Sequence, residues 1–148
     1  MVDKNTGATL GMSASLPTTY DDNGTTGYPS LTFTDIADIV DVGEVAKTWA
    51  VIAHQAVTRE YPQKAKDTYD IPDIPITIGR VSSDAGQVLL QTALSGSASY
   101  AFEIVLPSTD TVNFTAKVTK AGLGAVASGA FSTTMVTLAV DPETIFES

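Results

Sequence analysis

Acidic side chains recur at every third position in the segment DIADIVDVGE, residues 35–44. A metal site, an acidic helix face and a strand leading into a turn are three structures that could use this spacing. A helix is disfavoured, because like charges three residues apart repel each other and the β-branched residues between them have low helix propensity. On a strand, successive side chains point to opposite faces, so the four carboxylates could not converge on one ion. These acids are Asp35, Asp38, Asp41 and Glu44.

A calcium-binding loop would carry acids at alternate positions around a central glycine, and residues 35–44 do not follow that pattern. We therefore expect no metal in this segment. We interpret it as a strand that breaks near residues 41–43 and resumes at Val45.

The remaining candidates for catalysis are isolated. His54 is the only histidine and the chain has no cysteine, so disulfides and thiolate chemistry are excluded. A nucleophilic triad would need serine and acidic partners for His54 that no motif provides. The segment GLGAVASG, residues 122–129, lacks the lysine of a phosphate-binding loop, and we interpret it as a connection. We expect His54 to be a structural or surface residue, and we predict neither an enzyme nor a cofactor.

Length and composition describe one acidic domain. The chain has 148 residues, and 17 acids against 8 bases give it a formal net charge of −9. A nucleic-acid groove should be basic, so specific binding of DNA or RNA is disfavoured. The apolar runs are too short to span a bilayer, and the N-terminal segment holds no apolar signal-peptide core. We therefore expect a protein that does not enter membranes and is made in the cytoplasm.

The charges are unevenly distributed along the chain. Between Asn5 and Ala46 there are six acids and no lysine or arginine. The next segment then brings three bases: Arg59, Lys64 and Lys66. One interpretation is a solvated acidic surface with a mixed loop. The other is a pair of complementary patches that meet between copies of the chain.

Residues 58–75 hold three prolines, many charges and two tyrosines, and we expect them to form a long exposed loop or arm. Its length of about 18 residues exceeds that of most connections, and such loops are usually functional or disordered. Four apolar side chains would be left in water in an isolated arm, so we expect them to contact another subunit: Tyr61, Tyr69, Ile71 and Ile74. We expect Trp49 to lie in the core rather than to stack on a sugar.

One segment has a helical period. In residues 82–96, Ser83 or Asp84 can cap a helix and Gly96 can end it. The predicted buried stripe contains Ala85, Val88, Leu89 and Thr92, widened by Leu90, Ala93 and Leu94.

The remaining segments alternate or are extended, which indicates antiparallel strands. The turn PSTD, residues 107–110, joins two alternating runs into a hairpin. Phe102 and Ile104 share a face of the first run, and Phe114 shares a face of the second with Ala116, opposite Asn113 and Thr115. Further strands are expected in residues 8–17, 31–40, 47–57, 76–81 and 131–140. The predicted fold class is mainly β: an antiparallel β-sandwich or barrel with one flanking α-helix, in a single domain of residues 1–148.

Several segments resemble the major tail tube proteins of lambda-like siphophages. The segment LTFTDIADIVDVGEVAKTW resembles their pattern of aromatic-Thr-x-aliphatic-small-acid-aliphatic, then aliphatic-Gly-acid, then Lys-Thr-aromatic. KNTGATLGMSASLPTTYD resembles their N-terminus, SSDAGQVLLQTAL their single helix, and YAFEIVLP and NFTAKV their following strands. The resemblance covers nearly the whole chain in order. It departs at residues 56–75, where many relatives have a shorter and more polar hairpin.

This resemblance implies a structural virion protein of a phage tail. Such proteins form hexameric rings that stack into a tail tube, and their sheets join into a continuous barrel around a lumen that DNA traverses without specific binding. The implied partners are further copies of the chain and the tail terminator, tape measure and baseplate proteins. The expected inter-subunit contacts are Arg59, Tyr61, Lys64, Lys66, Tyr69, Ile71 and Ile74 of the arm and the acids Asp35, Asp38, Asp41 and Glu44.

A second class of function is also compatible with these residues. It is a β-sandwich binding module, such as a tail decoration domain or a carbohydrate-binding domain. The two classes differ in assembly, because a tube protein should form rings or tubes whereas a binding module should stay monomeric.

Overall fold

The structure, a computed structural model, describes residues 7–58, 60–81 and 83–147. The strands are β1 (Thr9–Ser13), β2 (Thr34–Asp35), β3 (Ile39–Val42), β4 (Thr48–His54), β5 (Gln63–Asp70), β6 (Ile74–Gly79), β7 (Tyr100–Val105), β8 (Thr111–Leu123), β9 (Thr133–Val140) and β10 (Phe146–Glu147). The helices are α1 (Ala85–Ser95) and two 3₁₀ turns, η1 (Tyr28–Ser30) and η2 (Pro142–Thr144).

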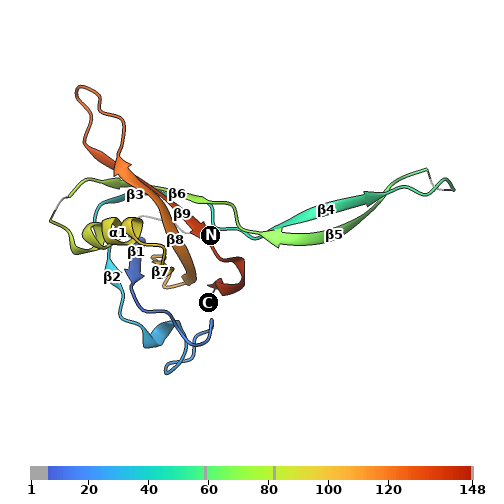
Figure 1. The fold of residues 1–148 in the computed structure, drawn as a ribbon, viewed down its shortest axis with the longest axis horizontal. Helices are drawn as coiled ribbons and strands as arrows, with labels where there is room; N and C mark the ends of the chain where they lie inside the picture. The colour runs from blue at the N-terminus through green and yellow to red at the C-terminus, as the bar shows by residue number, and fades with distance from the viewer. Residues whose placement is uncertain (1–6, 59, 82, 148) are drawn as a thin grey trace.

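The body is one antiparallel sheet with the order β2-β1-β7-β8-β9-β6-β3, and β10 pairs with β8 (Figure 1). Its two edge strands, β2 and β3, are joined by only three residues. The Ile36 N–H donates to the Leu10 carbonyl at 2.8 Å, and the Gly79 N–H donates to the Asp38 carbonyl at 2.7 Å. This short connection therefore ties β1 to β6 and curls the sheet into a barrel-like form. The predicted fold class, mainly β with one flanking helix, is confirmed.

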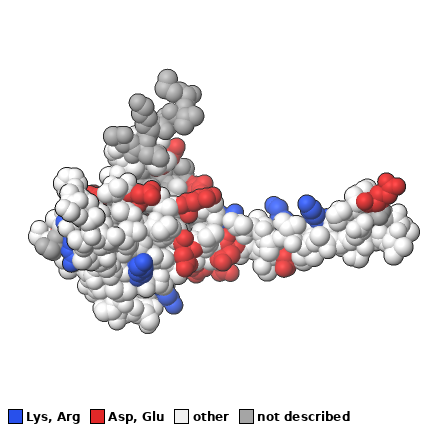
Figure 2. Space-filling view, turned by 90° about the horizontal axis from the view of Figure 1, so that it is seen from above, with Lys and Arg blue, Asp and Glu red and all other residues white. Residues whose placement is uncertain are grey.

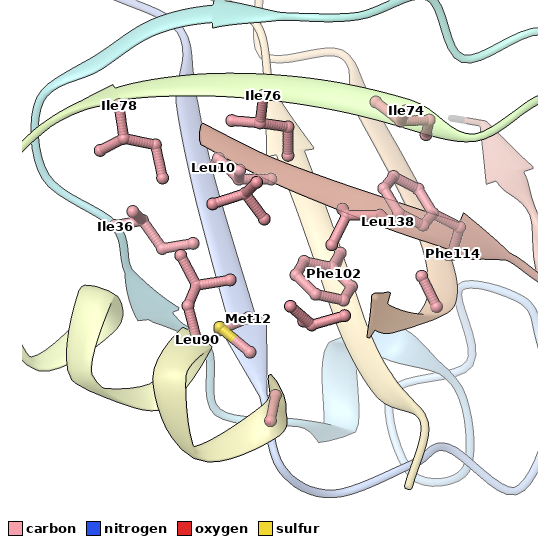
Figure 3. Packing of buried hydrophobic residues seen from close by; sticks show 14 residues of the cluster. Leu10, Met12, Ile36, Ile74, Ile76, Ile78, Leu90, Phe102, Phe114 and Leu138 are labelled. Carbon is pink, nitrogen blue, oxygen red and sulfur yellow. The ribbon is translucent and has the colours of Figure 1, made fainter. Parts of the chain in front are cut away.

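The core fills the inside of the curled sheet, with α1 packed against it (Figure 3). Phe102 of β7 and Phe114 of β8 are both fully buried, and their rings stack with centroids 5.6 Å apart. The predicted alternation of the β7–β8 hairpin is confirmed on this inner face. Asn113 and Thr115 on the opposite face are also buried. The Thr115 N–H donates to the Thr144 hydroxyl at 2.9 Å, because the C-terminal segment covers that side of β8.

The helix forms where it was predicted, and part of the predicted stripe is packed: Leu90 and Ala93 are buried, and Leu89 and Leu94 are half-buried against the core. Asp84 is the N-cap, and its carboxylate accepts the Gln87 N–H at 3.1 Å. The buried residues of α1 are Gly86, Gln87, Leu90 and Ala93. Val88, placed on the buried stripe by the sequence, is 51% exposed. Ala85 and Thr92 of the predicted stripe are exposed as well, because the close approach of α1 to the β2–β3 connection turns the side of the helix that contains Gly86 toward the core.

The strand break predicted near residues 41–43 is confirmed, because β3 ends at Val42 and residues 43–47 lie outside any strand. A second break, which the sequence did not predict, lies at residues 36–38, where Asp38 takes a left-handed conformation with φ of 57°. Asp41 pairs with Thr77 inside β3, after an irregularity that follows Ile39. Strand structure resumes at Thr48 rather than at Val45. The break at residues 36–38 falls where the chain crosses from one sheet edge to the other. A local sequence pattern does not reveal such a crossing.

The interpretation of residues 58–75 as a loop is corrected by the structure. Residues Gln63–Asp70 form β5, which pairs with β4 in a separate two-stranded sheet. Pro62 and Pro72 lie just outside the strand, where a missing N–H removes no ladder bond. Figure 1 shows that this β4–β5 hairpin projects far from the body. The arm is therefore a hairpin that also includes the extended run before it.

Candidate assembly surface

The β4–β5 hairpin is almost wholly exposed. Every residue of β4 is exposed, as is every residue of β5 except the half-buried Tyr69. Within the described chain, these two strands form a ladder only with each other. An isolated two-stranded hairpin is marginally stable in water, and stability usually requires a further strand or a packed surface. This hairpin is therefore the element that most needs a partner.

One face of the hairpin combines lysines with aromatic rings. Trp49 pairs with Tyr69, and Val51 pairs with Lys66 beyond a bulge. Because side chains on a strand alternate, these residues share one face. We call this surface the lysine face and define it as Lys47, Trp49, Val51, Ala53, Lys64, Lys66 and Tyr69.

Cation–π contacts organise the lysine face. The Trp49 and Tyr69 rings lie 4.8 Å apart between centroids. The Lys66 ammonium lies 5.2 Å from the Trp49 centroid, and the Lys47 ammonium lies 4.7 Å from that of Tyr69. Trp49 is 39% exposed, so the prediction that it lies in the core is wrong. It failed because the apolar run of β4 resembles a buried strand, whereas both of its faces are in fact exposed.

The opposite face of the hairpin is mostly neutral. Ile52 pairs with Ala65 and His54 pairs with Gln63. His54 is exposed, which confirms the expectation of a structural or surface residue. Ile52, at 52% exposure, adds apolar surface to this face.

Acidic side chains surround the base of the hairpin (Figure 2). Glu44 and Asp73 line a cleft beside the start of β4, and Asp141 and Glu143 line another beside Trp49. All of these carboxylates are exposed. We call this surface the acidic collar and define it as Glu44, Asp70, Asp73, Asp141 and Glu143.

The four acids of residues 35–44 are divided between different places. Asp35 pairs with Gly11 on β1, and Asp38 lies beside Gly79 of β6. Asp41 lines a different cleft, with Ile39 and Ile104, so of the four acids Glu44 alone reaches the collar. In the described part of the chain, no group of three or more histidine, cysteine, aspartate or glutamate residues is placed to hold a metal ion.

The predicted arm residues also separate into groups. Lys64, Lys66 and Tyr69 lie on the lysine face, and Tyr61 is exposed near the hairpin tip. Ile71 and Ile74, in contrast, are buried in the body. The remaining predicted contact, Arg59, lies outside the described residues.

Sequence reasoning missed Lys47 and four members of the collar. Lys47 could have been found, because it precedes Trp49 by two residues and so shares its face on a strand. The other four, Asp70, Asp73, Asp141 and Glu143, are brought together only by the fold.

A second exposed apolar surface lies at the connection between β8 and β9, which projects from the body in Figure 1. Phe131 is 94% exposed there and Val126 is 79% exposed. No charged residue occurs in residues 121–140. Scattered apolar residues on a surface are common, but a projecting group of them marks a contact region.

No described helix has the combined length and apolar character needed to cross a membrane. No protein-family model matches the sequence, and no curated protein matches it.

Solved structures do share the fold. A chain in the cryo-EM structure of an extracellular contractile injection system, the PVC sheath/tube terminator in its extended state, matches with a TM-score of 0.67 at 9% identity, over 100% of this chain and 97% of that chain. A chain of the anti-feeding prophage baseplate matches with a TM-score of 0.65 at 10% identity, over 100% and 95% of the two chains.

A third match comes from the tail of an empty GTA particle, refined with C6 symmetry. Its TM-score is 0.65 at 11% identity, and it covers 95% of each chain. At these identities the likeness establishes the fold and nothing finer. The chain has the fold found in components of phage-like tails and contractile injection systems.

Proposed function

We propose that this chain is a structural tail tube protein of a virion, made in the host cytoplasm, and that it is not an enzyme. Copies of it form hexameric rings, and the rings stack into a tube through which DNA is ejected. The tube contacts tail terminator, tape measure and baseplate proteins. The observation that carries this proposal is the shared fold, which spans at least 95% of the chain in matches from a terminator, a baseplate and a tail with C6 symmetry.

The surfaces of the chain support assembly. A projecting hairpin with exposed aromatic and apolar side chains is a liability for a monomer and becomes a contact in an oligomer. The edge strands β2 and β3 offer further pairing positions. In a symmetric ring, such surfaces are covered by neighbouring copies.

The charge of the chain supports a conduit that does not bind DNA. Six copies at −9 each make an acidic ring. Duplex DNA carries about one negative charge per 1.7 Å, and acids within roughly 8 Å of it, the Debye length at physiological salt, repel it. DNA would pass through a lumen of this kind without binding to its wall.

Negative-stain electron microscopy of the purified chain tests the proposal. We expect rings or tubes with sixfold end-on views at physiological salt. Dispersed monomers at high protein concentration would contradict the proposal and favour the β-sandwich binding module, whose sugar would then stack on the exposed Trp49–Tyr69 pair.

A further inference from the structure

We infer that the lysine face of one copy binds the acidic collar of a second copy, in a head-to-tail contact. This inference rests on the proposed self-assembly and names the surfaces that carry it. A contact between two different surfaces is heterologous, and repeating it generates a closed ring or an open filament. One molecule carries both surfaces, so every copy can donate its hairpin and accept another.

In the part of the chain that the structure describes, the lysine face forms no salt bridge with a carboxylate. Among the described residues, Lys66 contacts the Trp49 ring and Lys47 contacts the Tyr69 ring, and no carboxylate forms a salt bridge with Lys64 or Lys66. Lys64 and Lys66 sit along the shaft of the hairpin, paired with Ala53 and Val51. Lys66 lies over the Trp49 ring, which shares a cleft with Asp141 and Glu143, and Lys64 lies further toward the hairpin tip.

The collar has the complementary character. Glu44 and Asp73 line one cleft with Ala46, Thr48 and two prolines. Asp141 and Glu143 line the other, together with Asp67, Trp49 and Tyr69 of the hairpin of the same chain. Neither cleft has a lysine or arginine in its wall. Each surface is therefore a concentration of one sign of charge, which orients the approach of two copies and fixes their register.

Aromatic side chains add apolar surface to the contact, and burying it contributes free energy of association that ion pairs alone do not provide. Exposed ion pairs contribute little, because solvent and salt screen them. Trp49, Tyr69 and Val51 lie among the lysines, and tryptophan and tyrosine are the residue types enriched in the buried centres of interfaces. Burying these side chains against the Glu44–Asp73 cleft of a second copy, whose wall contains no residue of the lysine face, would stabilise the hairpin as well as the contact.

Nucleic acid is the other partner that lysines and aromatic rings can recognise. The position of the collar argues against it, because a phosphate backbone reaching Lys66 and Trp49 would also approach Asp141 and Glu143, which line the cleft that Trp49 shares. A second copy meets the lysines with carboxylates and leaves no such repulsion.

Charge reversal tests the contact in the full-length chain. One variant carries Lys64→Glu and Lys66→Glu, and a second carries Glu44→Lys and Asp73→Lys. A matched control carries Lys117→Glu and Lys120→Glu, two exposed lysines of β8, and changes the net charge as much as the first variant does. All of these positions are exposed, so thermal melts should show folded protein throughout. Sedimentation velocity at low and physiological salt then gives the concentration at which half of the protein assembles.

We expect each reversal alone to raise that concentration roughly tenfold or more at low salt, as expected for the loss of two charge pairs, and the control to change it little. Mixing the two reversed variants should restore assembly, because each then supplies the charge that the other needs. Combining all four changes in one chain should restore it as well.

Each other outcome overturns the inference. If the wild type assembles and the lysine reversal assembles equally well, the contact is wrong while the proposed function stands. Equal loss in the lysine variant and the control would show an effect of net charge alone. Binding of a 30-mer DNA by the wild type and not by the lysine variant, without self-association, would assign the lysine face to nucleic acid. Dispersed wild-type protein under every condition would overturn both the contact and the tube.

Discussion

At the scale of single residues, the side chain that fixes α1 to the sheet is Leu90. It is 2% exposed and belongs to the core cluster, whereas Val88 on the same helix is half exposed. Leu90→Ala should lower the free energy of unfolding by about 2–5 kcal/mol, because it leaves a cavity in a packed core. Val88→Ala should change it by less than about 0.5 kcal/mol. Urea denaturation of both variants measures the difference, and equal losses would place the packed stripe where the sequence pattern had put it.

Tyr28 gives a second prediction at this scale. Its hydroxyl donates to the Thr144 carbonyl, and burial raises the pKa of Tyr28 to about 12 from its ordinary value of 10.0. Below pH 10 the phenol is neutral in both states, so its contribution to stability is complete. Between pH 10 and about 12 the unfolded chain releases the proton while the folded chain keeps it, so stability falls as pH rises.

Tyr28→Phe removes this titration. Denaturant melts between pH 9 and pH 11.5 should therefore show a shallower loss of stability in Tyr28→Phe than in the wild type. All other residues are the same in the two proteins, so the difference between their curves reports Tyr28 alone. Parallel curves would mean that the phenol is not held in its neutral form by the fold.

At the scale of elements, the helix depends on a close approach of backbone to backbone. A Cβ on Gly86 would lie 2.8 Å from the Ile36 Cα and against the Asp35 carbonyl. Alanine normally favours a helix over glycine by about 1 kcal/mol. Here we expect Gly86→Ala to destabilise the protein by about 1–3 kcal/mol, because backbone atoms must move to admit the methyl group.

Gly122 in β8 is the matched control, since a Cβ there meets no atom within 4 Å. Thermal melts should show a lower midpoint for Gly86→Ala and little change for Gly122→Ala. A stabilised Gly86→Ala variant would show that the helix propensity outweighs the steric conflict.

The hairpin is the other element that the fold defines. Its apolar strand, β4, carries no alternation of apolar and polar residues because neither face is buried. Its second strand, β5, is polar along most of its length for the same reason. Strand pairing is visible in the sequence when one face is buried, so pairing in an exposed hairpin leaves a weak pattern.

At the scale of the whole molecule, we expect the body to provide the stability of the fold and the hairpin to provide the contacts for assembly. Among the described residues, the core cluster takes no member from β4 or β5. Replacing residues 51–67 by an Asn-Gly turn should therefore change the free energy of unfolding by less than about 0.5 kcal/mol. The same variant should not form rings or tubes.

Circular dichroism melts and negative-stain microscopy of the shortened chain measure the two effects. Normal tubes from this variant would make the hairpin dispensable for assembly. A collapse of stability would instead show that the hairpin supports the body.

The sequence by itself determined the elements whose signals are local. The Asp84 cap and the 3.6-residue period predicted α1, and the alternation around the PSTD turn predicted the β7–β8 hairpin. Both signals are local, because an element with one buried face has apolar residues at regular intervals along its own sequence. The tertiary structure decided the features that depend on contacts between residues far apart in the sequence. The approach of Gly86 to Ile36 determined which side of the helix is packed, and the crossing between sheet edges placed a further strand break at residues 36–38. One cleft joins Trp49 to Asp141 and Glu143 near the C-terminus, and no local pattern can report neighbours so far apart in the sequence.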